Sequence, residues 1–226
     1  MAAVGFSCCR FFYGGSKLIS DICSFFPEIR GNTHSIAETL IAGGIFIAIV
    51  ILVSLCVGKF ASNKWKGNKA KTITGFILIS STVAIALFCF FGLSVKAIQG
   101  IIFTLILLVS SYSDIKTREC DDYLSVMILI TAFIGIDLTA IPNMFIAAMF
   151  TAGIFLLVVV TVSDGIGGAD IKIASASVFL LGFQRGIIGL IAGLLLAIIV
   201  NSIKSKRLGF PMLPYLTAAF IPAFFL

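Results

Sequence analysis

The sequence predicts an all-α fold, a polytopic transmembrane helical bundle of about eight membrane segments, and three observations favour it. Of the 226 residues, 60% are hydrophobic and only 12% are charged, which is far from the balance of a soluble domain. The apolar residues form long uncharged runs, and one helical crossing of a bilayer takes about 20 of them. These runs lack the alternation over roughly ten positions that marks the strands of membrane barrels. Lipid is therefore the expected solvent for most of the chain.

The predicted membrane segments follow one another with short connections. They cover residues 40–57, 73–95, 97–113, 123–141, 143–163, 173–184, 186–203 and 208–226. The sixth is short for a crossing, so we expect it to be tilted, extended by a snorkelling Lys172 or incompletely inserted. Three regions result: an external N-terminal segment at 1–35, two accessory transmembrane helices with a basic loop at 36–96, and a six-segment core at 97–226. Such short connections leave no separate domain for chemistry, so an active site is expected at segment ends.

Basic residues lie mostly in the connections between segments. A net charge of +6 would point to nucleic acid in a soluble protein, but here the positive-inside rule explains it, and no nucleic-acid partner is expected. The connection 58–72 contains five lysines, which places it in the cytoplasm. Counting crossings from there puts both termini outside and the turns around Asp114 and Asp170 inside. Eleven of the 16 Lys and Arg residues are then cytoplasmic.

Two aspartates beside apolar runs are the candidates for chemistry. Asp114 follows one segment and Asp170 precedes another, so both carboxyls are expected at the same depth near the inner membrane face. Such a pair can share one proton and hold a water that attacks a carbonyl carbon. Because a helix is negative at its C-terminal end and positive at its N-terminal end, we expect Asp114 to hold the shared proton.

The residues around the aspartates narrow the chemistry further. Gly165, Gly167 and Gly168 precede Asp170, where they would allow a tight turn and the close approach of a helix or a substrate strand. The chain has one histidine and no C-x-x-C pair, so we expect neither a metal site nor a cofactor.

Two motifs give the chain a resemblance to a known family. The first reads Asp114-x-Lys116-x-Arg118 followed by Asp122-x-Leu124, and the second reads Gly167-Gly168-Ala169-Asp170-x-Lys172. They resemble the two aspartate motifs of the type IV prepilin and preflagellin peptidases. Residues 206–216 are also similar to the Pro-rich start of that family's last helix. The resemblance covers about residues 97–226 and implies that Asp114 and Asp170 are catalytic. Gly167, Gly168, Lys116, Arg118, Asp122 and Lys172 would support them, without a metal.

The resemblance also implies a function and a location. The protein would be an intramembrane aspartic endopeptidase of the cell membrane, which removes the short basic leader of pilin-like or flagellin-like precursors at the cytoplasmic face. The sequence departs from the family at Ala169, where the last glycine is expected, and at Asp121, where proline is common. Large bacterial members carry an insert with paired C-x-x-C motifs and also methylate the new N-terminus. The basic loop 58–72 is too short for that insert, so N-methyltransferase activity is not expected.

The residue pattern leaves several roles open. Lys116, Arg118 and Lys172 suit either electrostatic tuning of the site or anchoring at the inner face. Asp122 suits an N-cap for the segment that begins at residue 123. Asp137, an acid inside a predicted span, is expected to form hydrogen bonds between helices or at the interface.

Two other functions also fit acids beside helix ends. Acids beside Gly-rich helix breaks suit a proton-coupled transporter, although the hydropathy shows no matching halves. The third hypothesis is a non-enzymatic membrane subunit of a pilus or secretion machine.

Overall fold

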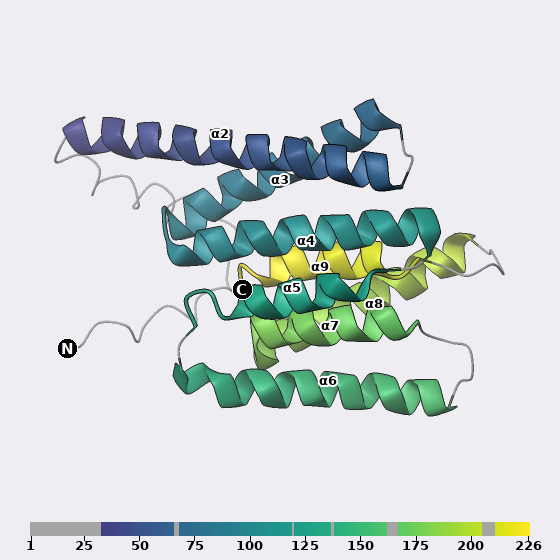
Figure 1. Ribbon diagram of the computed structural model, residues 1–226. Coiled ribbons are helices and arrows are strands. Elements are labelled where there is room, and N and C mark those ends of the chain that lie inside the picture. Colours follow the sequence, from purple (N-terminus) through teal and green to yellow (C-terminus); the bar gives the residue numbers. More distant parts are fainter. Residues whose placement is uncertain (1–32, 66–67, 119, 137, 162–166, 205–210) are drawn as a thin grey trace. The chain divides into compact units, whose positions relative to one another are not determined.

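The computed structural model describes residues 33–65, 68–118, 120–136, 138–161, 167–204 and 211–226 (Figure 1). Within these ranges the regular elements are helices: α2 (Thr33–Lys64), α3 (Lys69–Phe91), α4 (Val95–Thr117), α5 (Asp122–Ala132), η2 (Leu138–Ala140), α6 (Ile141–Thr161), α7 (Gly168–Leu181), α8 (Phe183–Lys204) and α9 (Leu213–Ala223). The all-α prediction is therefore confirmed. The chain divides into the units Met1–Gly44 and Ile45–Leu226, and the second unit contains both Asp114 and Asp170.

The helices fall into two groups by length. Four are long and apolar enough to cross a membrane, at Ile41–Lys64, Lys69–Phe91, Val95–Thr117 and Phe183–Ile203. By contrast, α5, α7 and α9 contain 11, 14 and 11 residues. At about 1.5 Å per residue, even α7 extends only about 21 Å, less than the roughly 30 Å of a bilayer's hydrocarbon core. Several membrane helices are thus confirmed, whereas eight complete crossings stay a prediction.

The first predicted connection is shorter than the sequence indicated. The predicted loop 58–72 is largely helical, since α2 continues to Lys64 and α3 begins at Lys69 after an N-cap at Asn68. Lysine and alanine are good helix formers, so a basic composition does not by itself end a helix.

Two later segments also differ from their predicted bounds. The predicted segment 123–141 is not one helix, because α5 ends at Ala132 and Gly135 takes a left-handed φ of 68° in the turn that follows. The last helix begins at Leu213 rather than at residue 208. Pro214 lies in its first turn, where the missing N–H of proline costs no hydrogen bond.

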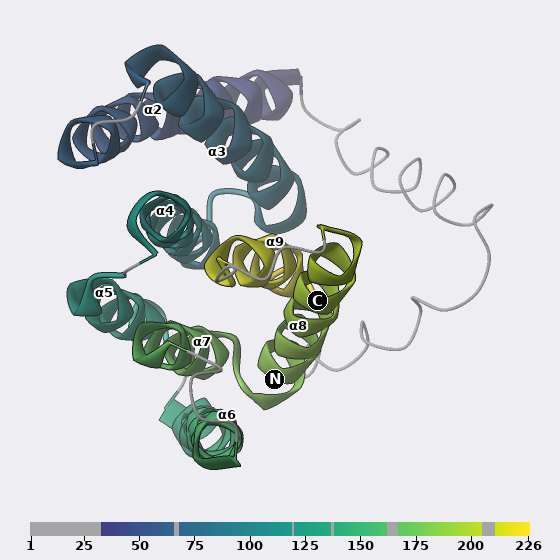
Figure 2. The ribbon, with the colours of Figure 1, turned by 90° about the vertical axis from the view of Figure 1, so that its right-hand side faces the viewer.

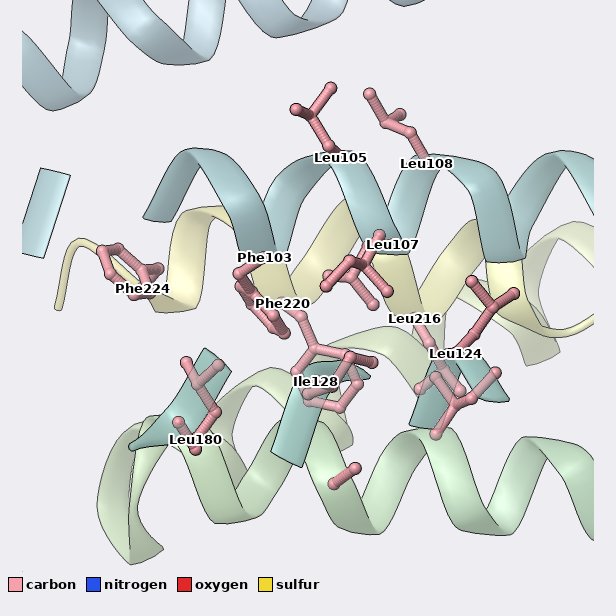
Figure 3. Packing of buried hydrophobic residues seen from close by; sticks show 14 of the residues in the cluster. Phe103, Leu105, Leu107, Leu108, Leu124, Ile128, Leu180, Leu216, Phe220 and Phe224 are labelled. Carbon is pink, nitrogen blue, oxygen red and sulfur yellow. The ribbon is translucent and has the colours of Figure 1, made fainter. Parts of the chain in front are cut away.

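Four helices form a closed ring around the core. Neighbours along the ring are α4 with α5, α5 with α7, α7 with α9, and α9 with α4 (Figure 2). Large side chains that are almost fully buried fill the space between them, and they include Phe103, Leu107, Ile128, Leu216 and Phe220 (Figure 3). In this ring α4 and α7 occupy opposite corners. The end of α4 and the start of α7 therefore lie across the ring from each other, with α5 and α9 on either side.

Glycines hold α8 close to its neighbours. A Cβ atom at Gly186 would lie 2.9 Å from the Cα atom of Val178 on α7, and one at Gly193 would lie 3.0 Å from the Cα atom of Leu216 on α9. Backbone cannot move aside as a flexible side chain can, so larger residues at these positions would push the helices apart. The ring is thereby supported from outside by a closely packed helix.

Candidate active site

An open hollow of about 480 Å³ lies where α4 ends and α7 begins. Its lining is Asp114, Arg118, Cys120, Asp122, Gly167, Gly168, Ala169 and Asp170. The fold therefore brings together both predicted catalytic aspartates and four of the six predicted supporting residues. The other two, Lys116 and Lys172, are not among the lining residues.

Asp114 is held by the start of another helix. It lies in the last turn of α4 with only 6% of its surface exposed, and it is the one buried charged side chain among the described residues. Its Oδ2 atom accepts a hydrogen bond of 3.0 Å from the backbone N–H of Leu213, and the backbone of Met212 adds a second one. Both donors belong to the N-terminal end of α9, which is the positive end of that helix. These donors stabilise a negative charge on Asp114 and offset part of the cost of burying it.

Asp170 has a different environment. It is the third residue of α7 and is partly buried, and its backbone N–H donates to the carbonyl oxygen of Gly167. Burial raises the pKa of the Asp170 carboxyl to about 6, and the charge of Asp114 adds to the effect. The two carboxyl groups are thus close enough to influence each other's ionisation. Among the described residues, no hydrogen-bond donor faces the Asp170 carboxyl.

The glycines before Asp170 keep the hollow open. Neither Gly167 nor Gly168 has a positive φ, and a Cβ atom at Gly168 would meet nothing within 4 Å. A Cβ atom at Gly167 would meet only the Asp170 carboxyl, at an ordinary 3.5 Å. At these two positions glycine is therefore required neither by a tight turn nor by close helix packing, which corrects the sequence-based expectation. Gly165 lies outside the described residues.

The charged residues around the hollow form exposed pairs. Lys172 pairs with Asp122 at 2.9 Å, and both side chains are largely exposed. The ammonium of Lys116 lies 5.9 Å from the ring centre of Tyr112. Arg118 ends α4 in a left-handed conformation with φ 57°. Its positive charge favours the ionised form of the Asp114 carboxyl.

The predicted N-cap at Asp122 is wrong by one residue. Asp121 occupies the N-cap position of α5, and Asp122 is the first residue of the helix. The Asp121 side chain makes no capping bond because its carboxylate pairs with Lys64 instead.

Three residues in or beside the site were given no role in it by the sequence analysis. Cys120 lines the hollow, and burial raises the pKa of its thiol to about 11, so it is neutral at physiological pH and not a thiolate nucleophile. Leu213 supplies a backbone donor, which no side-chain pattern reveals, although the Pro-rich start of the last helix marked the region. Lys64 contacts Asp121 from α2. Asp137 and residues 1–32 lie outside the described residues.

A helical membrane protein with two interacting carboxyls in one hollow at its helix ends has the arrangement of an intramembrane aspartic peptidase. Residues 101–202 match the type IV leader peptidase family, so this segment, which includes both aspartates, belongs to that family of aspartic leader peptidases. The suspected family is thereby confirmed. Neither the search of curated proteins nor that of solved structures found a match to the chain.

Proposed function

We propose that the protein removes the basic leader of type IV pilin-like precursors at the cytoplasmic membrane face, with Asp114 and Asp170 as its catalytic pair. The observation that carries the proposal is the shared hollow, into which α4 and α7 bring one carboxyl each from opposite corners of the ring. The membership of residues 101–202 in the leader peptidase family supports the same activity.

The environments of the two carboxyls favour different roles. Asp114 accepts backbone N–H groups at the positive end of α9 and is suited to be ionised, so it takes a proton from the attacking water. Asp170 has a raised pKa and is suited to be protonated, so it donates a hydrogen bond to the scissile carbonyl oxygen. The hydroxide adds to the carbonyl carbon. The proton that Asp114 accepted from the water then passes to the leaving nitrogen as the C–N bond breaks. This assignment is the reverse of the one that the helix dipoles of α4 and α7 alone predicted.

The lining of the hollow supports a basic substrate. Of the eight described residues that line it, three are carboxylic acids, Asp114, Asp122 and Asp170, and one, Arg118, is basic. A leader rich in Lys and Arg would be attracted to this excess of acid. Since the hollow lies at the end of apolar helices, a membrane-anchored precursor would reach it with the leader next to its own apolar helix.

Purified protein in lipid nanodiscs, mixed with a pilin-like precursor, tests the proposal directly. We expect a shortened precursor that mass spectrometry identifies as the product of one cut after the leader. A transporter or a non-enzymatic subunit would leave the precursor intact. Failure of correctly folded protein to cut a panel of such precursors would contradict the proposal.

The proposed orientation predicts where Asn63 can be labelled. Asn63 is exposed near the end of α2, beside Lys64, which pairs with the Asp121 next to the hollow. In a cysteine-free background, Asn63→Cys should resist a membrane-impermeant thiol reagent in intact cells and react after the membrane is opened. Ready labelling in intact cells would place the hollow outside and refute the cytoplasmic site.

The proposed pair also predicts a bell-shaped dependence of cleavage rate on pH. Activity requires one ionised and one protonated carboxyl. The rate should fall in acid as Asp114 becomes protonated, and it should fall again as the pH rises above about 6, where Asp170 loses its proton. We expect roughly a tenfold lower kcat/KM for each pH unit on the alkaline side. A rate that stays constant from pH 5 to 9, or that a chelator abolishes, would contradict the aspartic mechanism.

The accessory helices contact the turn that leads into the hollow. Lys64 at the end of α2 pairs with Asp121, and its ammonium lies 5.1 Å from the ring centre of Tyr123. The hydroxyl groups of Thr72 on α3 and Tyr112 on α4 lie 3.0 Å apart. These contacts join α2 and α3 to the segment that carries Asp114, so Lys64 is suited to act as a positioning residue.

Charge exchange tests this positioning role. Lys64→Asp should lower kcat/KM about two- to fivefold, because an exposed pair contributes little free energy. The double variant Lys64→Asp with Asp121→Lys should recover most of the loss. Lys59→Asp, an exposed change on the same helix, serves as the control for altered membrane charge. If the double variant is no better than Lys64→Asp alone, the pair does not position the site.

A further inference from the structure

A second cavity, of about 280 Å³, lies at the opposite end of the ring from the aspartates. The start of α4, the end of α5 and the end of α7 contribute to it, together with the starts of α6 and α8. The hollow, in contrast, is formed where α4 ends and α7 begins. The second cavity is therefore separate from the proposed cleavage site.

Two basic residues that line this cavity lie in the first turns of helices, where a positive charge is electrostatically unfavourable. Lys96 is the second residue of α4, and Arg185 is the third residue of α8. Cations in the first turn of a helix are repelled by its positive end, so these two placements each cost free energy. Among the described residues, neither side chain pairs with a carboxylate, and no acid lines the cavity. Among the described residues, two helix starts and two cations thus bring positive charge together beside one cavity, an arrangement that favours an anion.

The remaining lining indicates what kind of anion fits. Asn143, from the first turn of α6, adds an exposed amide, while Gln99 is engaged with the carbonyl oxygen of Thr131 at 3.1 Å. Apolar side chains complete the wall, among them Met144, Leu180 and Phe224. A group that is anionic at one end and apolar at the other would satisfy both parts of the lining.

We propose that this cavity binds a phosphate group through Lys96 and Arg185. A planar guanidinium and a flexible ammonium are suitable partners for phosphate oxygens. A free phosphate ion and an anionic phospholipid headgroup share this chemistry. The apolar wall and the exposed Leu93, Val95 and Ile98 beside Lys96 favour the lipid.

Thermal unfolding and calorimetry in detergent test the site. The probes are dioctanoyl phosphatidylglycerol, dioctanoylglycerol without phosphate, and inorganic phosphate against chloride at equal ionic strength. We expect phosphatidylglycerol to raise the Tm of the wild-type protein by several degrees, and dioctanoylglycerol to have little effect. The variant Lys96→Gln with Arg185→Gln should lose at least four-fifths of that shift. The matched variant Lys59→Gln with Lys69→Gln removes two exposed charges that do not line the cavity, and it should keep the shift.

The other outcomes are also decisive. An equal response to inorganic phosphate and phosphatidylglycerol supports the site with free phosphate as its source. An equal response of the wild type and the Lys96→Gln, Arg185→Gln variant to phosphatidylglycerol overturns the proposal, because the binding would then not depend on the cavity. The variant Asp137→Asn removes the acid that follows the lining residue Ile136 in the sequence, and so tests whether this acid takes part in binding. Unchanged or tighter binding in that variant supports the proposal, and lost binding overturns it.

Discussion

Asp114→Asn and Asp170→Asn should each abolish precursor cleavage while the protein still inserts and accumulates. Asparagine keeps the size of aspartate but has neither the negative charge nor the transferable proton. At position 114 its side-chain oxygen can still accept the hydrogen bond from the N–H of Leu213, so α9 should stay in place. General acid and base catalysis contributes about a hundredfold to ten-thousandfold in rate, and we expect each variant to lose about a thousandfold or more in kcat. Single-turnover cleavage in nanodiscs, with the Tm as a check on folding, measures this loss.

The double variant and a neighbouring carboxylate supply the controls. If the two aspartates act as the proposed pair, the double variant should be no slower than either single variant. Asp122→Asn removes a carboxylate from the same hollow, but this residue is exposed and paired with Lys172, so its loss should be only a few fold. Wild-type cleavage by either Asp114→Asn or Asp170→Asn would show that the catalytic pair has been assigned wrongly.

Much of the architecture could be predicted from hydropathy alone. Long uncharged runs make helices in lipid because every backbone polar group must be bonded within the segment. Helix ends were harder to predict. The helix α2 extends through a lysine-containing stretch to residue 64, whereas Gly135 and Pro214 lie at helix boundaries inside apolar runs. The apolar composition of a segment indicates that it lies in lipid, but it does not show where the helix ends. Turns depend on single residues with unusual backbone preferences.

The candidate site was predictable in its side chains but not in its backbone. The motif spacing identified Asp114 and Asp170, and the structure places both in one hollow. The donors from Met212 and Leu213 could not be foreseen, because they are main-chain groups that tertiary packing brings across from the last helix. That packing favours a charged Asp114, which the dipole of its own helix alone would disfavour. Local electrostatics therefore gave an incomplete account of a site assembled from three helices.

The last expected effect concerns Gly168, whose missing side chain leaves room in the hollow. A substrate that is cut between the two carboxyls must bring its own backbone close to the start of α7. Gly168→Leu should therefore lower kcat/KM at least tenfold by occupying this space, and Gly168→Ala should cost only a few fold. Neither change should lower the Tm by more than about 2 °C, because a Cβ atom at residue 168 meets no neighbour within 4 Å. Gly153→Leu is the matched control, since position 153 on α6 is equally open but does not line the hollow. If Gly168→Leu cleaves as fast as Gly153→Leu, the substrate does not pass over this turn, and the role assigned to the glycines would have to be abandoned.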